Sequence, residues 1–398
     1  MDMQKQENKV VLLSILGICF GFLGWSEIMS DFTYKKFSGL ENIVFIISLL
    51  SLVHALTCVT ANLIVIKMSH KNPQKLFNSL LLLNAIAVVF VGISALYNNI
   101  YLFATCYIVY MIFSELLSMS HFAYQTSVTE EGRFIAVQNK RFTLFKIIIC
   151  MSTILSNLIV IKYMDFGFFL TTILSSITFL FVYFNIRQIK CRTITQVVKE
   201  EPFLQKLNFT KYSSVIKRYG LATMITRFAL ANIIILFSIH LLQNNMEFSL
   251  LKEIKNYAVG FAIMAYFVVK KVNMKGIEIK TTIFLEIMII ALIGLSIWNP
   301  LFLILLTGIY TIDNLVELTG RFKIFEKDTY PEKNIEKNSI MDIGLFGIQA
   351  LSSIILLNIP FNIAISIIVL AMVAAIILKI RCEWDNSYRK SRNSEKSV

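Results

Sequence analysis

Four charged side chains lie deep inside long apolar stretches of the sequence: Glu27, Glu115, Arg227 and Asp313. An ionised group in hydrocarbon costs at least about 2.5 to 3.5 kcal/mol, so such groups tend to face a protein interior or a water-filled cavity. A buried carboxylate without a cationic partner favours its protonated form and can exchange protons near neutral pH. Proton exchange and ion pairing are therefore the chemistries that these residue types predict.

The two carboxylates, Glu27 and Glu115, are the predicted proton-coupling residues. The partners that the sequence offers near them are His121, about two helical turns from Glu115, and His54. A hydrogen bond from a neighbouring serine, tyrosine or asparagine to each carboxyl group is the purely structural alternative. His54, alone in an apolar stretch, also fits a packing role.

Arg227 and Asp313 form a predicted ion pair. Each lies six or seven residues from the same end of its apolar stretch, which at about 1.5 Å per residue places both roughly 10 Å deep. The pair would be either broken and remade during function or a fixed structural bridge, since a fixed bridge also satisfies buried charge.

Composition identifies the setting of these charges as a membrane. Apolar residues make up 56% of the chain and charged residues 16%, against about 25% charged in a soluble domain. A helix that crosses a bilayer needs about 20 mostly apolar residues, and twelve such runs occur. They are 10–30, 42–66, 76–98, 100–124, 143–163, 166–187, 220–242, 251–269, 281–298, 300–319, 340–358 and 360–380.

The distribution of basic residues predicts the orientation of these spans. Of the 38 lysines and arginines, 31 fall in segments on the side of the N-terminus and five on the other side. This bias places both termini in the cytoplasm. The formal charge of +13 is spread over short segments, so no nucleic-acid partner is predicted. The abundance of Ile, Asn and Lys is typical of an AT-rich bacterial gene, which indicates the bacterial cytoplasmic membrane.

Metal and nucleotide chemistry lack their usual motifs. The six cysteines include no CxxC pair, and the four histidines are too scattered to predict a zinc site. No glycine-rich phosphate loop is present, which argues against an ATP-driven pump. No metal, no cofactor and no enzymatic activity are predicted.

The longest basic, polar connection divides the chain into two halves. The predicted organisation is a first bundle at 1–188, a linker at 189–219, a second bundle at 220–380 and a tail at 381–398. "SHKNPQK", which starts at Ser69, follows the second span, and "NMKGIEIK", which starts at Asn273, follows the eighth. Gly-Arg-Phe follows both the fourth and the tenth span. Matched positions in the two halves indicate an internal repeat.

This arrangement resembles the major facilitator superfamily, in which twelve helices form two six-helix bundles. The resemblance implies an all-α integral membrane fold and cytoplasmic gating loops after spans 2, 4, 8 and 10. In that family the loop after helix 2 typically reads Gly-x-x-x-Asp-Arg-x-Gly-Arg-Arg/Lys. This sequence departs from the motif, with Ser69 at its acidic position and Asn72 at the following glycine. The residues at the positions of the gating loops are Ser69, Asn72, Arg133, Asn273, Gly276 and Arg321.

The resemblance also implies a central cavity lined by spans 1, 4, 7 and 10. The four deep charges lie in these spans. The further lining residues that we expect are His54, Trp25, His121 and Tyr124. A solute site near the middle of the bilayer follows from this arrangement.

The predicted function is secondary active transport by alternating access. The leading hypothesis is proton-coupled export of a drug or a peptide-like compound by a monomer. The alternative is proton-coupled uptake of a nutrient. The best argument for uptake is that the fifth span has no glycine or proline and so lacks the Gly-Pro motif of many antiporters. A flippase for lipid-linked saccharides is a third hypothesis.

Overall fold

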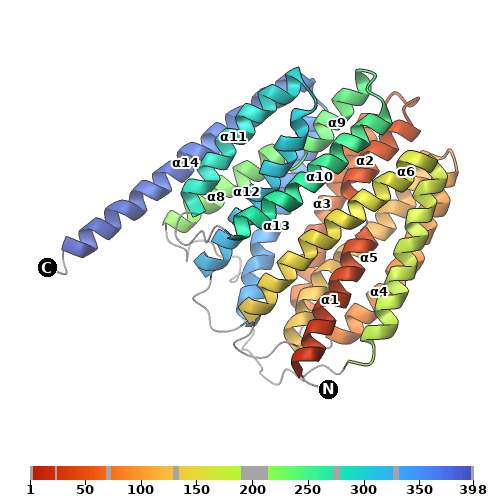
Figure 1. Cartoon of the computed structure of the whole chain (residues 1–398), viewed down its shortest axis with the longest axis horizontal. Coiled ribbons are helices and arrows are strands. Elements are labelled where there is room, and N and C mark those ends of the chain that lie inside the picture. Colours follow the sequence, from red (N-terminus) through yellow and green to blue (C-terminus); the bar gives the residue numbers. More distant parts are fainter. Residues whose placement is uncertain are drawn as a thin grey trace.

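The computed structural model describes residues 3–22, 25–68, 73–128, 134–189, 214–271, 278–325 and 331–395, and the side chains of most of them. In this part of the chain all regular structure is helical (Figure 1). The helices are α1 (Met3–Phe22), α2 (Trp25–Lys36), α3 (Ile43–Met68), α4 (Pro73–Leu96), α5 (Ile100–Val128), α6 (Phe134–Ile186), α8 (Ser214–Leu230), α9 (Ile233–Gln243), α10 (Phe248–Lys271), α11 (Glu278–Trp298), α12 (Phe302–Phe325), α13 (Pro331–Leu357) and α14 (Phe361–Glu395).

These helices account for the twelve expected spans. The first span is divided into α1 and α2 and the seventh into α8 and α9, whereas α6 contains both the fifth and the sixth. The prediction of an all-α fold with twelve spans is thereby confirmed. Because the number of spans is even, α1 begins and α14 ends on the same side, toward the lower left in Figure 1. We call this side the termini side and the opposite one the far side.

The ends of several helices differ from the predicted boundaries. Helix α8 begins at Ser214, inside the predicted linker, and α14 continues to Glu395, into the predicted tail. The Gly-Arg-Phe sequence at 320–322 lies within α12 and not in a loop, because that helix ends only at Phe325. Polar residues continue a helix beyond the bilayer without changing its backbone, so hydropathy does not show where the helix ends.

Helix α6 turns back on itself on the far side. Met164 has a positive φ of 44°, and Figure 1 shows the two halves of α6 running in opposite directions. A side-chain Cβ at Gly167 would lie 2.5 Å from the carbonyl oxygen of Ile159. Only glycine therefore fits this turn, which explains how one continuous apolar segment makes two spans.

Each half of the chain has an apolar core of its own. In the first half Phe32 stacks on Phe168 with ring centroids 4.3 Å apart, and Phe103 packs beside them. A second core, including Ile289 and Leu306, joins the helices from α8 onward. The two halves meet where α3 packs against α13 and α6 against α10.

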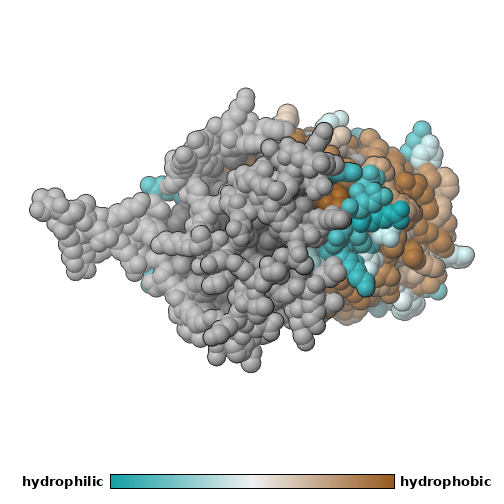
Figure 2. All heavy atoms as spheres, turned by 90° about the horizontal axis from the view of Figure 1, so that it is seen from below, coloured by the Kyte–Doolittle hydropathy of each residue, from teal (hydrophilic) through white to brown (hydrophobic). Residues whose placement is uncertain are grey.

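The outer surface of the described helices is apolar. Large side chains such as Phe45, Ile86, Phe90, Phe284 and Leu370 are more than half exposed, and the described surface in Figure 2 is largely hydrophobic. Within the described residues, seven helical stretches are long and apolar enough to cross a membrane. A surface of this kind requires lipid contact, so the chain is a multi-pass membrane protein.

One fully buried ion pair holds the second half together. Lys379 Nζ in α14 lies 2.5 Å from Glu286 Oε1 in α11, and the Thr226 hydroxyl in α8 donates to the same oxygen at 2.6 Å. The two residues lie in the predicted spans 281–298 and 360–380, and neither was singled out from the sequence. In the structure neither side chain has solvent-exposed surface.

We expect Lys379→Met to destabilise the protein by about 3 to 5 kcal/mol, because it leaves the Glu286 carboxylate buried without its cation. Removing both charges in Lys379→Met/Glu286→Gln should recover most of this loss. Thermal unfolding of the purified protein in detergent measures the effect. The exposed Lys162 supplies the control, since Lys162→Met should change stability by less than about 0.5 kcal/mol. Equal stability of the single and double variants would contradict a structural role for the pair.

Candidate functional site

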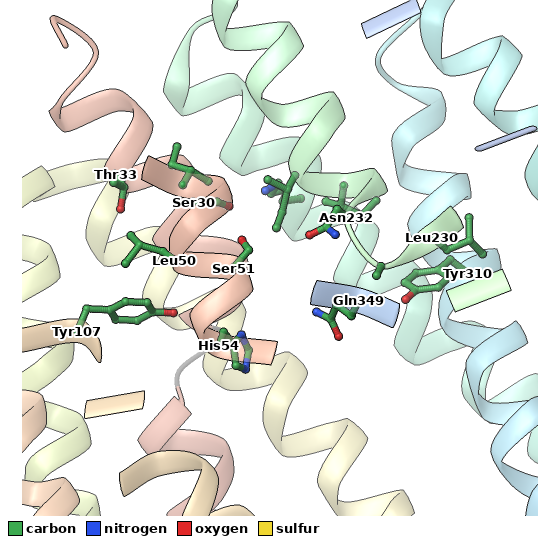
Figure 3. A pocket seen from close by; sticks show the side chains of 15 residues that line it. Ser30, Thr33, Leu50, Ser51, His54, Tyr107, Leu230, Asn232, Tyr310 and Gln349 are labelled. Atoms are coloured by element: carbon green, nitrogen blue, oxygen red, sulfur yellow. The ribbon is translucent and has the colours of Figure 1, made fainter. Parts of the chain in front are cut away.

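A cavity of about 260 Å³ lies between the two halves (Figure 3). Its wall combines hydroxyl, amide and imidazole groups with aliphatic side chains, and apolar atoms supply the larger part of its surface. The described residues that line it are Ser30, Thr33, Ile47, Leu50, Ser51, His54, Tyr107, Leu230, Ala231, Asn232, Ile234, Ile235, Lys255, Tyr310 and Gln349.

The seventh span is broken where it passes this cavity. Helix α8 ends at Leu230, α9 begins at Ile233, and the turn between them exposes Ala231 and Asn232 to the cavity. The Ser352 hydroxyl of α13 donates to the Phe228 carbonyl oxygen at 2.7 Å. Irregular backbone at membrane depth is tolerated where it lines a cavity and where side chains satisfy its polar groups.

The side chain of Asn232 fixes the position of this turn. Its amide donates to the hydroxyl oxygens of Ser352 at 3.1 Å and Ser353 at 3.0 Å. Asn232 is fully buried, so these bonds replace the water that the amide would otherwise need. The sequence analysis did not identify Asn232, because its partners lie more than 100 residues away in the chain.

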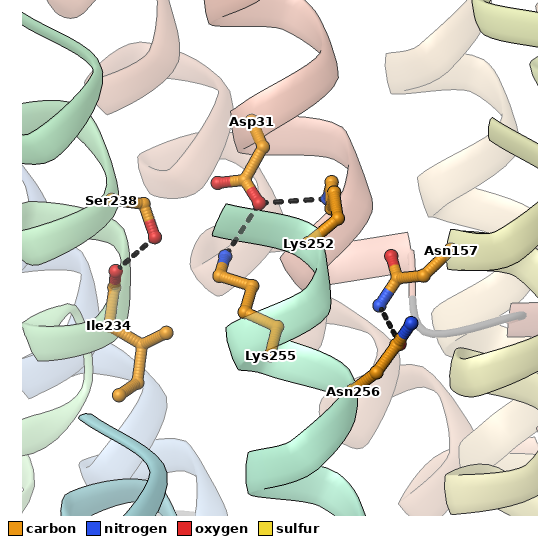
Figure 4. A network of polar contacts seen from close by, with 7 residues as sticks. All are labelled: Asp31, Asn157, Ile234, Ser238, Lys252, Lys255 and Asn256. Carbon is orange, nitrogen blue, oxygen red and sulfur yellow. Dashed lines mark hydrogen bonds and ion pairs between the residues drawn. The ribbon is translucent and has the colours of Figure 1, made fainter. Parts of the chain in front are cut away.

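A buried ionic cluster joins the two halves on the far side of the cavity (Figure 4). Asp31 Oδ2 in α2 lies 2.8 Å from Lys252 Nζ and 2.6 Å from Lys255 Nζ in α10. The three side chains are at most 7% exposed. From the sequence, both lysines were counted among the five basic residues on the side opposite the N-terminus, and Asp31 was not considered. The spacing of Lys252 and Lys255, which places both on one helix face, is the signal that could have identified them.

Other polar contacts between the halves also lie toward the far side. The Asn358 amide donates to Ser48 Oγ at 2.9 Å, and the Asn157 amide donates to Asn256 Oδ1 at 2.9 Å. Helix α2, the far half of the first span, also contacts α9, the far half of the seventh. These polar contacts between the halves thus lie on the same side of the cavity as the Asp31 cluster.

His54 and Glu115 meet on the first-half side of the cavity. His54 Nε2 in α3 lies 3.0 Å from Glu115 Oε1 in α5. The imidazole side chain is 25% exposed and lies on the cavity wall, whereas the carboxylate behind it is only 7% exposed. Cys58 lies one turn from His54 on the same helix. One potential ligand atom from each of these three residues lies within 4.8 Å of the others.

The other predicted residues of the first half lie in different surroundings. His121 Nε2 is 2.6 Å from Ser14 Oγ, and Tyr124 stacks on Phe77 with ring centroids 5.1 Å apart. Both side chains are buried inside the first bundle, away from the described cavity wall. Trp25 and Glu27 belong to α2, but their side chains lie outside the described part of the structure.

The predicted Arg227–Asp313 ion pair remains a prediction. Asp313 is 1% exposed, and Arg227 is partly exposed.

The predicted gating loops fall mostly outside the described residues. Arg321 lies within α12, although its side chain is not described. The loop residues outside the described ranges are Ser69, Asn72, Arg133, Asn273 and Gly276.

Comparison by sequence finds no match to a protein-family model or to a curated protein. Comparison by structure finds close likenesses. A D-xylose–proton symporter matches with a TM-score of 0.68 and 11% identity over 93% of this chain and 96% of its own. The human organic anion transporter MFSD10 matches with a TM-score of 0.66 and 11% identity, over 94% of this chain and 99% of its own.

FucP, described as a major facilitator superfamily transporter in the outward conformation, matches with a TM-score of 0.64 and 13% identity. The match covers 94% of this chain and 98% of FucP. Nearly complete coverage of both chains means that the whole architecture is shared, not only one bundle. The chain therefore has the fold of the major facilitator superfamily.

Proposed function

We propose that this protein is a secondary transporter that carries a small polar organic solute by alternating access. The observation that carries the proposal is the cavity between the halves, which has a broken helix on one wall and a buried ionic cluster on its far side. In alternating access two bundles rock about a central site, so that the site opens to one side at a time. The contacts between the halves on the far side supply the closed gate of one such state.

The cavity limits the kind of solute. Its volume of about 260 Å³ is small beside the roughly 300 to 1,000 Å³ of typical ligand pockets. Side chains such as Ser51, Tyr310 and Gln349 offer hydrogen bonds from several directions. This wall suits a compact hydrogen-bonding solute, such as a sugar, an amino acid or a short peptide-like compound, better than a bulky apolar drug.

Lys255 connects solute binding to the gate. It lies on the cavity wall and also binds Asp31. A solute oxygen that accepts a hydrogen bond from the Lys255 ammonium group competes with the Asp31 carboxylate for it. Such competition weakens the link between α2 and α10 and lowers the free energy needed to open the far side.

Export, the direction that the sequence favours, remains part of this proposal, with nutrient uptake as the alternative. The direction in which the solute moves under an imposed proton gradient distinguishes export from uptake.

We expect Asp31→Asn to shift the protein toward a state open on the far side. The change leaves Lys252 and Lys255 buried without their carboxylate, and opening relieves this by letting water reach them. The measurement is the labelling rate of a cysteine at Ser51, on the cavity wall, by a membrane-impermeant maleimide added to the far side of oriented proteoliposomes. The rate should rise at least about tenfold, which corresponds to about 1.4 kcal/mol.

Asp165→Asn is the matched control for this experiment. Asp165 pairs with Lys36 on the far side, but both residues belong to the first half. Removing this pair should leave the labelling of Ser51→Cys unchanged. An unchanged rate in Asp31→Asn, or an equal increase in Asp165→Asn, would be inconsistent with a gate formed by Asp31.

We assign proton coupling to Glu27. Of the two carboxylates predicted from the sequence, Glu115 has His54 beside it, whereas the side chain of Glu27 lies outside the described part of the structure, so the sequence-based prediction is tested at Glu27. We expect far-side labelling of Ser51→Cys to depend on pH in the native chain. Glu27→Gln, which mimics the protonated acid, should hold labelling at its low-pH value.

Labelling rates in this test are compared with those of Ser38→Cys, an exposed position in the far-side turn, because thiol reactivity itself varies with pH. Glu41→Gln, a change at an exposed acid in the same turn, is the control and should retain the pH dependence. If Glu27→Gln retains it as well, Glu27 does not couple protons to the conformational change.

A further inference from the structure

We propose that His54, Cys58 and Glu115 form a binding site for a divalent transition-metal ion on the wall of the central cavity. The ion class is that of Zn²⁺, Co²⁺ and Fe²⁺, which bind imidazole nitrogen, thiolate sulfur and carboxylate oxygen. The inference goes beyond the transport function and does not depend on it. Metal binding and alternating access are also measured by different experiments.

Two helices bring the three ligands together. His54 and Cys58 are four residues apart on α3 and therefore lie on the same face of that helix. Glu115 reaches this face from α5, which packs against α3 within the first half. A site made in this way needs no change in how the two halves are arranged.

The distances are close to those of a coordination sphere. The three ligand atoms all lie within 4.8 Å of one another. Ligands at about 2.0 to 2.3 Å from a tetrahedral ion are roughly 3.3 to 3.6 Å apart. His54 Nε2 and Glu115 Oε1, now 3.0 Å apart, would separate slightly and Cys58 Sγ would move inward. Side-chain rotations are sufficient for these movements.

The charges of the site match those of the ion. A Cys58 thiolate, a Glu115 carboxylate and a neutral His54 imidazole carry a total charge of −2, so the occupied site is neutral. Neutrality matters because Cys58 is 1% and Glu115 5% exposed, and an uncompensated charge at such depth is costly. Binding releases the thiol proton to water, as metal binding by cysteine requires.

The site has a route for entry and a place for a fourth ligand. The His54 side chain is 25% exposed and forms part of the cavity wall, so an ion in the cavity meets the imidazole first. Three protein ligands leave one position of a tetrahedral ion open, as in sites that bind water or a further molecule. Tyr107 lines the same cavity and lies close enough to interact electrostatically with Glu115 and Cys58.

The test uses Co²⁺ as the probe, because thiolate coordination to Co²⁺ produces a charge-transfer absorption band. The full-length protein, purified in detergent without a histidine tag, is titrated with Co²⁺. We expect one Co²⁺ per chain with a thiolate band that Zn²⁺ removes by competition. The band should disappear in Cys58→Ser and remain in Cys382→Ser, a change at another buried cysteine, in α14. His54→Gln and Glu115→Gln should each weaken Co²⁺ binding at least about tenfold.

The following outcomes would overturn the proposal. Stoichiometric Co²⁺ without a thiolate band means that the ion binds elsewhere, and a band that persists in Cys58→Ser means that another cysteine is the ligand. The Ser51→Cys labelling assay, repeated in each ligand variant without metal, shows whether the variant still folds and changes state. Loss of metal binding with labelling intact supports the site. If the native protein changes state but binds no metal, the proposed metal site is wrong and the transport proposal is unaffected.

Discussion

Pairing of charges inside an apolar slab is the constraint on which this structure depends. Among the described residues, three buried carboxylates, those of Asp31, Glu115 and Glu286, each lie beside a basic side chain from another helix. A carboxylate in such surroundings is costly unless it is paired. Each pair therefore determines how two helices pack. The His54–Glu115 pair fixes the arrangement within the first bundle, and the Lys379–Glu286 pair does so within the second. The Asp31 cluster instead connects parts that must separate if the protein alternates.

In the alternating-access cycle that we propose, the Asp31 cluster acts as a two-state gate. In the closed state the ions are paired and dry. In an open state they are separated and hydrated. A half-open state would have neither fully paired nor fully hydrated ions, so it is less favourable than the closed state and the open state. The Lys36–Asp165 pair lacks this property, because the Asp165 side chain is 42% exposed and stays hydrated throughout.

The sequence was sufficient for the architecture because the membrane imposes it locally. Each span must be apolar over a fixed length, and this requirement can be read without knowing which helices touch. The turn inside α6 shows the same point, since the short gap between two predicted spans corresponds to the reversal at Met164. The fold was predictable wherever one stretch of chain and the bilayer determined the outcome.

The site was less predictable because its contacts are between distant parts of the chain. Asp31 and Lys252 are 221 residues apart. Hydropathy does not distinguish a lysine that reaches water at the end of a helix from one buried against a partner. Glu115 and His54 were both recognised as buried polar residues, and the structure brings them together. The four-residue spacing of His54 and Cys58 was visible in the sequence, but its meaning depends on Glu115 in another helix.

The low identity to proteins of the same fold indicates what the polar side chains are for. Apolar helices of suitable length are enough for the spans of this fold, whereas each buried polar group has a free-energy cost. Asn232 and Ser352 are explained by the broken helix, and Asp31 by the contact between the halves. Gln349 and Tyr310 lie on the cavity wall. In the transport function that we propose, contact with a solute is the role of these two side chains, which would place the specificity of the protein in the wall formed by α12 and α13.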